Sequence, residues 1–449
     1  MKKDTIAAIS TALGHSAISI VRMSGDAVFD IIDKIYKGKD LSKVNSHTIN
    51  YGKIYDQGKL IDEVLVSVFR SPKTFTKEDI IEINCHGGAY AAKKILELLL
   101  TNGARLAEKG EFTERAYLNG RIDLTQAESL MDVIEARSEK ALHLAAEGLD
   151  GKVYRLIQGL REKLLDTVAN IEVNIDYPEY DDVEMLTNEI LLPKMTALKQ
   201  EIDHIVKQAY VGRVIKDGIK TVIIGRPNVG KSSVLNALLK EDKAIVTDIQ
   251  GTTRDIVEGQ INIGGIILNL IDTAGIRDSD DLIEKIGIDK AKALIDEAEL
   301  VLYVLNNNEP LSFEDEKLLE LTAHKKRIVI INKIDLESKI GRQFESSVQI
   351  SALKGININS LEEKIESMFL QGGLEKAGET YLSNARHIAK MRQVQQSLKD
   401  AIDAAHQMYP VDMIEIDLKS AWETLGEIIG QSKNTDLLDE LFSKFCLGK

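Results

Sequence analysis

Hydrophobic and polar positions in the first 118 residues switch several times between strand-like and helix-like spacing. Residues 5–10 and 17–23 alternate or run apolar, which predicts strands. One helix is predicted after Ser24-Gly25-Asp26, and another opens at Gly87-Gly88 and continues through Leu100. Further strands are predicted at 47–55, 60–69 and 79–84. This mixture predicts an α+β domain over residues 1–118.

Helical spacing dominates residues 119–215, where Ala, Leu, Glu and Lys prevail, and it returns in residues 376–449. Thr125 is the predicted N-cap of the first helix. The predicted helices cover 125–148, 153–175, 188–211, 385–403, 413–428 and 437–445. The most economical topology is one discontinuous helical domain, 119–215 and 376–449, interrupted by an inserted domain after Asp217-Gly218.

Strands and helices alternate in residues 216–375, which predicts a parallel α/β sheet. Between a strand-like run at 221–224 and a helix-like run from Ser233 lies the sequence GRPNVGKS, residues 225–232. In this context the spacing G-x-x-x-x-G-K-S predicts a phosphate cradle rather than a chance glycine-rich turn. Backbone N–H groups would face the phosphates, Lys231 would add positive charge, and Ser232 would bind Mg²⁺.

Four polar stretches follow in the order that a GTP-binding domain of the Ras-like class requires. Thr252 and Thr253 lie in a loop that closes on Mg²⁺ and the γ-phosphate, and 272–275 (DTAG) follows a buried strand. Asp335, in the stretch NKID, can accept hydrogen bonds from the N–H and NH₂ groups of guanine, whereas an ATPase would leave it without a role. Residues 351–353 (SAL) predict a backbone contact to the guanine oxygen.

Two details of this inserted domain bear on catalysis. Ile276 stands where Ras-like proteins commonly carry the Gln that orients water, so another group must orient it. Asn228 is an uncharged ligand that is well placed for a monovalent cation. Such a cation would supply the positive charge that an arginine finger gives elsewhere.

Composition adds few constraints. The net charge of −14 disfavours a dedicated nucleic-acid coat protein, and no apolar run is long enough for a membrane span. Cys85 and Cys446, the two cysteines, predict no disulfide framework and favour a cytoplasmic protein. For Cys85-His86, a tight turn is favoured over a nucleophilic pair. The acidic residues between 179 and 184 favour a solvated loop over a metal site.

The chain ends in FCLGK, residues 445–449, which is not a C-a-a-X lipidation box. Together with GRPNVGKS, the stretch GTTRD at 251–255 and the inserted GTPase domain, this ending resembles the MnmE (TrmE) family of tRNA modification GTPases. The resemblance runs nearly end to end and includes TKED at 76–79 and GEFTERA at 110–116.

This resemblance implies a GTP-hydrolysing component of a system that installs an aminomethyl-type group on carbon 5 of the wobble uridine in tRNA. The implied partners are a second copy of the chain, the flavoprotein MnmG and tRNA. The implied one-carbon donor is 5,10-methylene- or 5-formyl-tetrahydrofolate, bound by the N-terminal dimerisation domain. The residues implied for folate are Arg22, Glu82, Arg121 and Lys449. Cys446 would lie near the folate with a chemical role, and Lys is also found at the position of Arg121.

The resemblance further implies that K⁺-dependent dimerisation of the GTPase domains drives GTP hydrolysis. Mg²⁺ would be held by Ser232 and Thr253, and Glu284 would orient or activate water. K⁺ would be held by Asn228, Thr247, Ile249 and Thr252. With the motifs above, the residues expected around GTP are Asn228, Val229, Gly230, Lys231, Ser232, Ser233, Thr247, Asp248, Thr252, Thr253, Asp272, Thr273, Ala274, Gly275, Asn332, Lys333, Asp335, Ser351, Ala352 and Leu353. Leu353 departs from the usual Ser-Ala-Lys, which matters little for a backbone contact.

Two rival functions remain at this level. A ribosome-assembly GTPase would be expected to append a basic RNA-binding module, and the appended parts here are not of that kind. A signalling switch would use its helices as docking surfaces. Neither rival gives the terminal cysteine-containing segment a purpose.

Overall fold

The computed structural model describes residues 4–176, 188–239, 259–271, 288–370, 380–431, 438, 441–445 and 447–448. The chain divides into two compact units. The first contains Met1–Met131, Leu149–Tyr154 and Gly426–Lys449, and the second contains Asp132–Gly148 and Arg155–Leu425. The predicted limits of the three domains stay a prediction.

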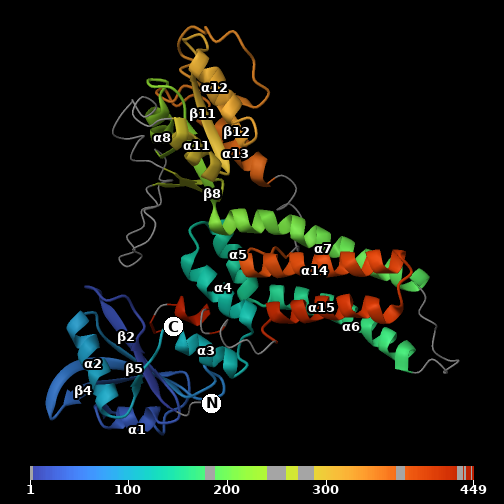
Figure 1. Ribbon diagram of the computed structural model, residues 1–449. Helices are drawn as coiled ribbons and strands as arrows, with labels where there is room; N and C mark the ends of the chain where they lie inside the picture. Colours follow the sequence, from blue (N-terminus) through green and yellow to red (C-terminus); the bar gives the residue numbers. More distant parts are fainter. Residues whose placement is uncertain are drawn as a thin grey trace. The chain divides into compact units, whose positions relative to one another are not determined.

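The first unit is built on a sheet that appears in shades of blue in Figure 1. Its described strands follow the order β3-β4-β5-β6-β2-β1-β7. Neighbouring strands are antiparallel except for β1 and β7. The strands are β1 Ile6–Ile9, β2 Ile18–Ser24, β3 Tyr36–Gly38, β4 Thr48–Asp56, β5 Lys59–Phe69, β6 Ile80–His86 and β7 Arg105–Leu106. The longer strands match the predicted runs, whereas β3 and β7 are too short to give a periodic signal.

Helices α1 (Val28–Asp33) and α2 (Ala89–Thr101) cover one face of this sheet. Val21 of β2 and Ile83 of β6 are buried against Ile95 of α2 in one apolar cluster. Because side chains alternate along a strand, Arg22 and Glu82 fall on the opposite face. The α+β architecture predicted for this part of the chain is confirmed.

The predicted helix over 125–148 is wrong, because two helices occupy this stretch. Helix α4 covers Leu124–Glu135 and α5 covers Glu139–Leu149. Ser138 starts α5, since its Oγ accepts a hydrogen bond from Ala141 N at 3.2 Å. The cap of α4 is Asp123, whose Oδ1 accepts from the backbone N–H groups of Thr125 and Gln126. The apolar residues keep their helical spacing across the break between α4 and α5, so periodicity alone does not reveal the break.

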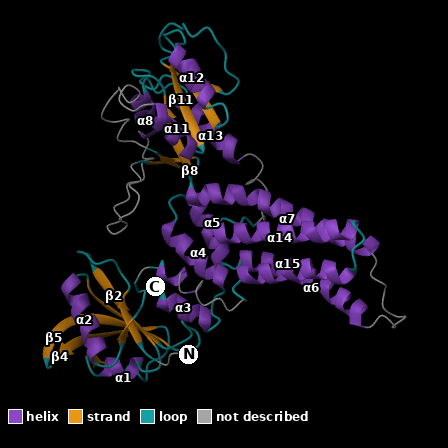
Figure 2. Cartoon of the chain, viewed as in Figure 1, coloured by secondary structure: helices purple, strands orange, loops and turns teal. Residues whose placement is uncertain are grey.

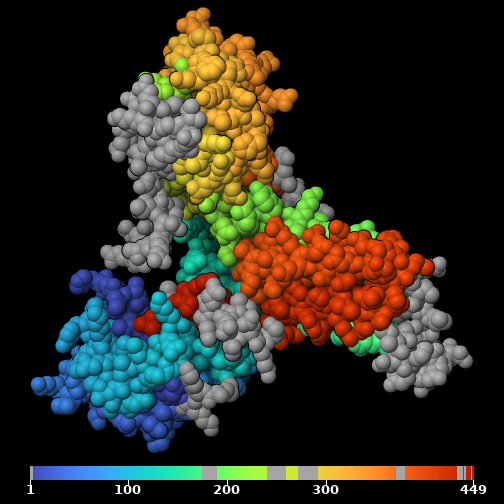
Figure 3. Space-filling view, in the orientation of Figure 1, coloured from blue at the N-terminus to red at the C-terminus, as the bar shows by residue number. Residues whose placement is uncertain are grey.

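The remaining helical part of the second unit draws on both predicted segments. It contains α7 Asn188–Asp217, α14 Ala385–His406 and most of α6 Lys152–Asp176 and of α15 Val411–Ile428. Gln395 of α14 donates to Asp203 of α7 at 2.6 Å. The guanidinium of Arg161 in α6 lies 4.2 Å from the ring centroid of Trp422 in α15. Figure 3 shows α14 and α15 covering one side of this helical part.

The strands of the inserted segment, drawn in orange in Figure 2, form a second sheet. Over its described strands the order is β13-β12-β11-β8-β10-β9. Pairing is parallel except between β9 and β10. The strands are β8 Ile219–Ile224, β9 Gln260–Ile263, β10 Ile266–Leu270, β11 Leu300–Asn306, β12 Lys326–Asn332 and β13 Ser347–Gln349. The helices are α8 Lys231–Leu239, α11 Ile288–Glu297, α12 Phe313–Leu321 and α13 Ile358–Leu370.

Apolar clusters lie on both faces of this sheet, and β11 is buried along its whole length. Counted within the segment, the strand order is 6-5-4-1-3-2, which is the order of Ras-like GTP-binding domains and confirms the predicted fold. Ligands of such sheets bind beyond the carboxyl ends of the strands, where the strand order reverses. That point is the end of β8.

None of the described helices combines the length and the apolar character needed to cross a membrane.

Candidate functional site

The phosphate loop lies between the end of β8 and the start of α8, as its spacing predicts. Gly230 has a φ of 97°, and a Cβ added there would lie 2.4 Å from Nδ2 of Asn332. A Cβ on Gly225 would lie 2.4 Å from the carbonyl oxygen of Val304. Neither position has room for a side chain, so the backbone itself lines the loop. This is the cradle that a phosphate requires.

Lys231 places its amino group over this loop. The residue is buried, and Nζ donates hydrogen bonds to the carbonyl oxygens of Gly225 at 3.1 Å and Arg226 at 2.9 Å. Ser232 and Ser233 follow in the first turn of α8, whose N-terminus favours negative charge. Val229 is buried in the apolar core and fixes the middle of the loop. The residues present fit a triphosphate and its Mg²⁺.

Asn332 and Lys333 join the end of β12 to the phosphate loop. Nδ2 of Asn332 donates to the carbonyl oxygen of Val229 at 3.0 Å, and its Oδ1 accepts from the backbone N–H of Ala352 at 3.0 Å. Nζ of Lys333 donates to the carbonyl oxygen of Asn228 at 2.7 Å. The predicted base-side motifs and the predicted phosphate loop therefore form one site.

Asp335 is held in place by Ser351. The hydroxyl of Ser351 donates to Oδ1 of Asp335 at 2.7 Å, and this bond lowers the pKa of the Asp335 carboxyl. The ionised carboxylate is the form that accepts hydrogen bonds from guanine. The side chain of Leu353 is 82% exposed, as expected for a backbone contact. Lys354, which sequence reasoning missed, brings Nζ within 3.7 Å of Asp335.

Several predicted site residues lie outside the described residues. For GTP, Mg²⁺, K⁺ and water activation they are Thr247, Asp248, Ile249, Thr252, Thr253, Asp272, Thr273, Ala274, Gly275, Ile276 and Glu284. Asn228, the remaining residue predicted for K⁺, is exposed at the tip of the phosphate loop with a φ of 60°. Asn tolerates this left-handed conformation better than most residues.

Arg226 is a site residue that sequence reasoning missed. Its Nε forms an ion pair with Oδ2 of Asp315 at 2.8 Å, and its Nη2 donates to Glu309 at 3.1 Å. Asp315 is fully buried in the first turn of α12 and also accepts from the hydroxyl of Tyr303 at 3.0 Å. The pair ties the phosphate loop to α12. Because Arg226 and Asp315 are far apart in sequence, no local sequence motif predicts their ion pair.

A second candidate site lies in the first unit, where Arg22 and Glu82 meet the end of the chain. The two residues are cross-strand partners on β2 and β6, and Nε of Arg22 donates to Oε1 of Glu82 at 2.8 Å. Nη1 of Arg22 also donates to the carbonyl oxygen of Gly448 at 3.3 Å. Cys446 and Lys449 lie outside the described residues. The terminal segment nevertheless reaches Arg22, which is itself paired with Glu82.

Arg121, the other described residue predicted for folate, lines a separate open cavity of about 570 Å³. The walls of this cavity include the rings of His47 and Phe69 and the side chain of Lys73. Among the described residues, no hydrogen bond or ion pair joins Arg121 to Arg22 or Glu82. The structure therefore brings Arg22 and Glu82 together but not Arg121 with them.

Cys85 and His86 do not form a nucleophilic pair. Cys85 is buried, and its Sγ donates to the carbonyl oxygen of Ser19 at 3.3 Å. Burial raises the pKa of its thiol to about 11. His86 is exposed and shares a hydrogen bond of 2.6 Å with Asp62. The two side chains point to opposite faces of β6, and a turn at Gly87 follows, as favoured from the sequence.

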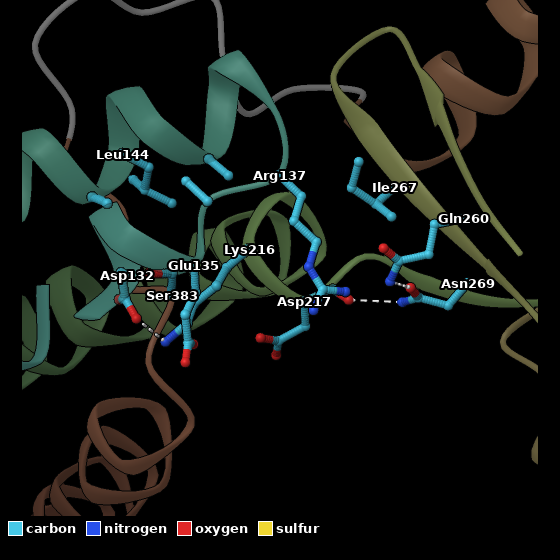
Figure 4. A pocket seen from close by; sticks show the side chains of 13 residues that line it. Asp132, Glu135, Arg137, Leu144, Lys216, Asp217, Gln260, Ile267, Asn269 and Ser383 are labelled. Atoms are coloured by element: carbon cyan, nitrogen blue, oxygen red, sulfur yellow. Dashed lines mark hydrogen bonds and ion pairs between the residues drawn. The ribbon is translucent and has the colours of Figure 1, made fainter. Parts of the chain in front are cut away.

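A polar pocket of about 240 Å³ lies where α7 passes into β8 (Figure 4). Nδ2 of Asn269 donates to the carbonyl oxygen of Asp217, and Nε2 of Gln260 donates to Oδ1 of Asn269, both at 2.8 Å. Lys216 forms an ion pair with Asp132 at 2.8 Å. These contacts tie the β9–β10 hairpin and α4 to the end of α7, so the pocket marks the entry of the chain into the inserted domain.

Comparisons with known proteins agree with this arrangement. Two family models match: the MnmE helical domain over residues 124–446 and the GTP-binding protein TrmE N-terminus over residues 5–121. The "tRNA modification GTPase MnmE" of Lactococcus lactis subsp. lactis (strain IL1403) is 52% identical, covering 99% of this chain and 98% of the relative. The protein of the same name from Bacillus subtilis (strain 168) is 52% identical, covering 99% of this chain and 100% of the relative.

Proposed function

The chain belongs to the MnmE family of tRNA modification GTPases, and from this premise we propose that it drives modification of carbon 5 of the wobble uridine in tRNA. Membership makes the chain a GTP-hydrolysing enzyme that acts in tRNA modification. The observation that carries the nucleotide assignment is the hydrogen bond of Ser351 to Asp335, beside an Asn332 that holds the phosphate loop. The modification product, a (carboxymethyl)aminomethyl uridine, is proposed from the family.

Guanine selection follows from the chemistry of Asp335. Its carboxylate accepts hydrogen bonds from N1–H and the amino group of guanine, and adenine has no matching pair of donors. Binding the wrong base would leave a carboxylate and its neighbours without partners, which costs about 10⁴-fold in affinity. The Ser351 hydroxyl fixes the orientation of the carboxylate before the base arrives.

Hydrolysis is proposed to need Mg²⁺, K⁺ and a second GTPase domain. Lys231 would bind the β- and γ-phosphates, and Ser232 with Thr253 would hold Mg²⁺, which neutralises charge on these phosphates. Asn228 with Thr247, Ile249 and Thr252 would hold K⁺ in place of an arginine finger. Because Ile276 cannot orient water, Glu284 would do so. The exposed position of Asn228 supports access from a second copy.

The second site is proposed to bind tetrahydrofolate. Arg22, Glu82 and the terminal Lys449 would contact it, with Cys446 nearby and Arg121 meeting its anionic tail. The contact of Arg22 with Gly448 supports this grouping, because it brings the end of the chain to the residue that pairs with Glu82. Arg22 would orient an anionic or carbonyl group of the ligand, while Glu82 accepts from its N–H groups.

The sheet face that carries Arg22 and Glu82 is proposed to pair with a second copy of the chain. Large apolar side chains on this face remain exposed, among them Ile49 at 68% and Tyr51 at 60%. The cross-strand row that contains Ile49 continues through Ser67 to Glu82 and Arg22. An exposed apolar face beside a binding site marks an interface. We also propose that the chain acts in the cytoplasm, with the flavoprotein MnmG as its partner and tRNA as its substrate.

The test is mass spectrometry of tRNA wobble nucleosides from cells that lack this chain. We expect the aminomethyl-type uridines to disappear and to return when the unsubstituted chain is supplied. Complementation with Lys231→Ala should fail, because the phosphates lose their charged partner. Unchanged uridine modification in the deletion cells would refute this function and favour a ribosome-assembly GTPase or a signalling switch.

A further inference from the structure

The carboxyl-terminal segment is packed into the first unit by two phenylalanines. Phe442 and Phe445 are 3% and 2% exposed and lie in an apolar cluster with Ala116, Ile122 and Ala127. Their rings are 5.6 Å apart. These contacts hold the segment against the apolar cluster. They end at Phe445, before Cys446 and Lys449, which are proposed to lie at the folate.

Beyond Phe445, the backbone itself makes the contacts. Leu447 forms a β-bridge with Lys109. Gly448 has a φ of 90°, and a Cβ there would lie 2.4 Å from the carbonyl oxygen of Ile9. Gly110 has a φ of 71°, and a Cβ there would lie 2.5 Å from the carbonyl oxygen of Phe442. Glycine at 448 lets the terminal segment approach β1 closely, and glycine at 110 lets the backbone around residue 110 approach Phe442.

The carbonyl oxygen of Gly448 accepts hydrogen bonds from residues on β2 and at the end of β1. Oγ of Ser10 donates to it at 3.0 Å, and Nη1 of Arg22 donates to it at 3.3 Å. Ser10 is itself fixed, because its backbone N–H donates to the carbonyl oxygen of Ile20 at 2.8 Å. Arg22 is shared, since its Nε donates to Glu82 and its guanidinium lies 5.7 Å from the ring centroid of Phe112.

We propose that Ser10 is a positioning residue for the chemistry at the end of the chain, because it holds the Gly448 carbonyl beside the Arg22–Glu82 pair. The inference rests on the proposed folate site. A carbonyl oxygen has two lone pairs, and here they serve Ser10 and Arg22. When a ligand engages the Arg22 guanidinium, its bond to Gly448 weakens, and the neutral Ser10 bond keeps the segment in register.

The proposal is tested on the full chain by hydrogen–deuterium exchange, followed by mass spectrometry of the peptide that contains residues 441–449. Ser10→Ala should speed exchange in this peptide about fivefold, the population change expected for one lost neutral hydrogen bond. Peptides from β2 and β6 should not change. Ser10→Thr keeps the hydroxyl and should restore slow exchange.

Ser16→Ala is the matched control. Oγ of Ser16 also donates to a backbone carbonyl, that of Ile18 at 2.9 Å, and Ser16 lies in the same β1–β2 connection. No hydrogen bond joins it to the described residues of the terminal segment. This variant should leave exchange at 441–449 unchanged. Unchanged exchange in Ser10→Ala, or equal acceleration in Ser16→Ala, would overturn the proposal that Ser10 holds the Gly448 carbonyl.

A second readout separates positioning from simple stability. In a system reconstituted from the full chain, the flavoprotein MnmG, tRNA, GTP, Mg²⁺ and K⁺, with 5,10-methylene-tetrahydrofolate as one-carbon donor and an amine as nitrogen donor, Ser10→Ala should lower the turnover of uridine modification about fivefold. Ser10→Thr should recover it. Faster terminal exchange with full modification turnover would overturn the positioning role and leave the proposed function intact. No modification by the unsubstituted chain would overturn both.

Discussion

Nδ2 of Asn332 donates a hydrogen bond to the carbonyl oxygen of Val229, 3.0 Å away, and thereby links the base side of the nucleotide site to the phosphate loop. The same side chain accepts from the backbone N–H of Ala352 at 3.0 Å. Asn332 is 2% exposed, so both bonds are shielded from water. One buried amide therefore holds together three stretches that are far apart in sequence.

Replacing Asn332 with Ala should weaken the whole site. The change leaves the Val229 carbonyl and the Ala352 N–H without their partner, at a cost of about 2–4 kcal/mol for both. We expect the thermal midpoint of the second unit to fall and the affinity for GDP to drop about tenfold or more. Differential scanning calorimetry and a fluorescent-nucleotide titration measure the two effects.

Asn170→Ala is the control for that experiment. Nδ2 of Asn170 donates to the carbonyl oxygen of Asp166 on the exposed surface of α6. Removing this bond should change stability by no more than about 0.5 kcal/mol. Equal losses in the two variants would show that the Asn332 bonds carry no special weight.

Asp335→Asn should change base preference. Xanthine carries a carbonyl oxygen at carbon 2 where guanine carries an amino group, and an Asn amide can donate to that oxygen. Affinity for GTP should fall about 10³-fold or more, while affinity for XTP rises above that of the unsubstituted protein. Titration with GTP, XTP and ATP measures this. Retained GTP selectivity would mean that Asp335 does not contact the base.

The pKa of Asp335 also predicts a pH dependence. The Ser351 hydrogen bond lowers the folded-state pKa below its ordinary value, so this contribution to stability is complete above that ordinary value. It is lost as pH falls through the lowered value, below about pH 4. GDP affinity should therefore be flat between pH 8 and 5.

Ser351→Ala tests that sign. Without the hydroxyl, the pKa of Asp335 returns toward its ordinary value, and the loss of affinity should begin at a higher pH. Ser351→Thr retains the hydroxyl and should behave as the unsubstituted protein. Titrations from pH 3 to 6 distinguish the two variants, and identical profiles would contradict the assigned role of the Ser351 bond.

Gly218 connects α7 to β8 and should not tolerate a side chain. It has a φ of 78°, and a Cβ there would lie 2.4 Å from the carbonyl oxygen of Ile267 and 2.8 Å from Nδ2 of Asn269. Gly218→Ala should cost about 2–4 kcal/mol through strain and overlap. Gly355 has a φ of 70° with open space around it, so Gly355→Ala isolates the conformational strain of about 1 kcal/mol. Calorimetry should rank the two variants in that order.

The nucleotide-binding motifs were predictable from sequence because their chemistry is local. Residues 225–232 carry both the glycine spacing and the Lys–Ser pair, and Asp335 belongs to the stretch NKID at the end of a buried apolar strand. The fold of the inserted segment follows from alternating strand-like and helix-like runs. Each of these signals lies within a short stretch of the chain.

The contacts that hold the motifs together were not predictable in this way. The Arg226–Asp315 pair and the Ser10–Gly448 bond join residues that come together only through tertiary folding. The break between α4 and α5 was missed because Ser138 caps a new helix where helical spacing continues. A periodic pattern of apolar residues indicates which face of a helix is buried, but it does not locate the helix ends. A side-chain capping bond can end one helix and start another without changing that pattern.

Asn228 gives the sharpest test of the proposed hydrolysis mechanism. If its side chain helps to hold K⁺ at the phosphates, GTP turnover should be about tenfold or more faster in K⁺ than in Na⁺ at equal ionic strength. Asn228→Ala should remove this difference and slow turnover in K⁺ to the Na⁺ rate. GDP affinity should change far less, because Lys333 bonds to the backbone carbonyl of Asn228, which the substitution leaves in place. Equal GTP turnover of the unsubstituted chain in the two salts would refute the role of K⁺. If Asn228→Ala still hydrolysed GTP faster in K⁺ than in Na⁺, residues other than Asn228 would have to bind the cation.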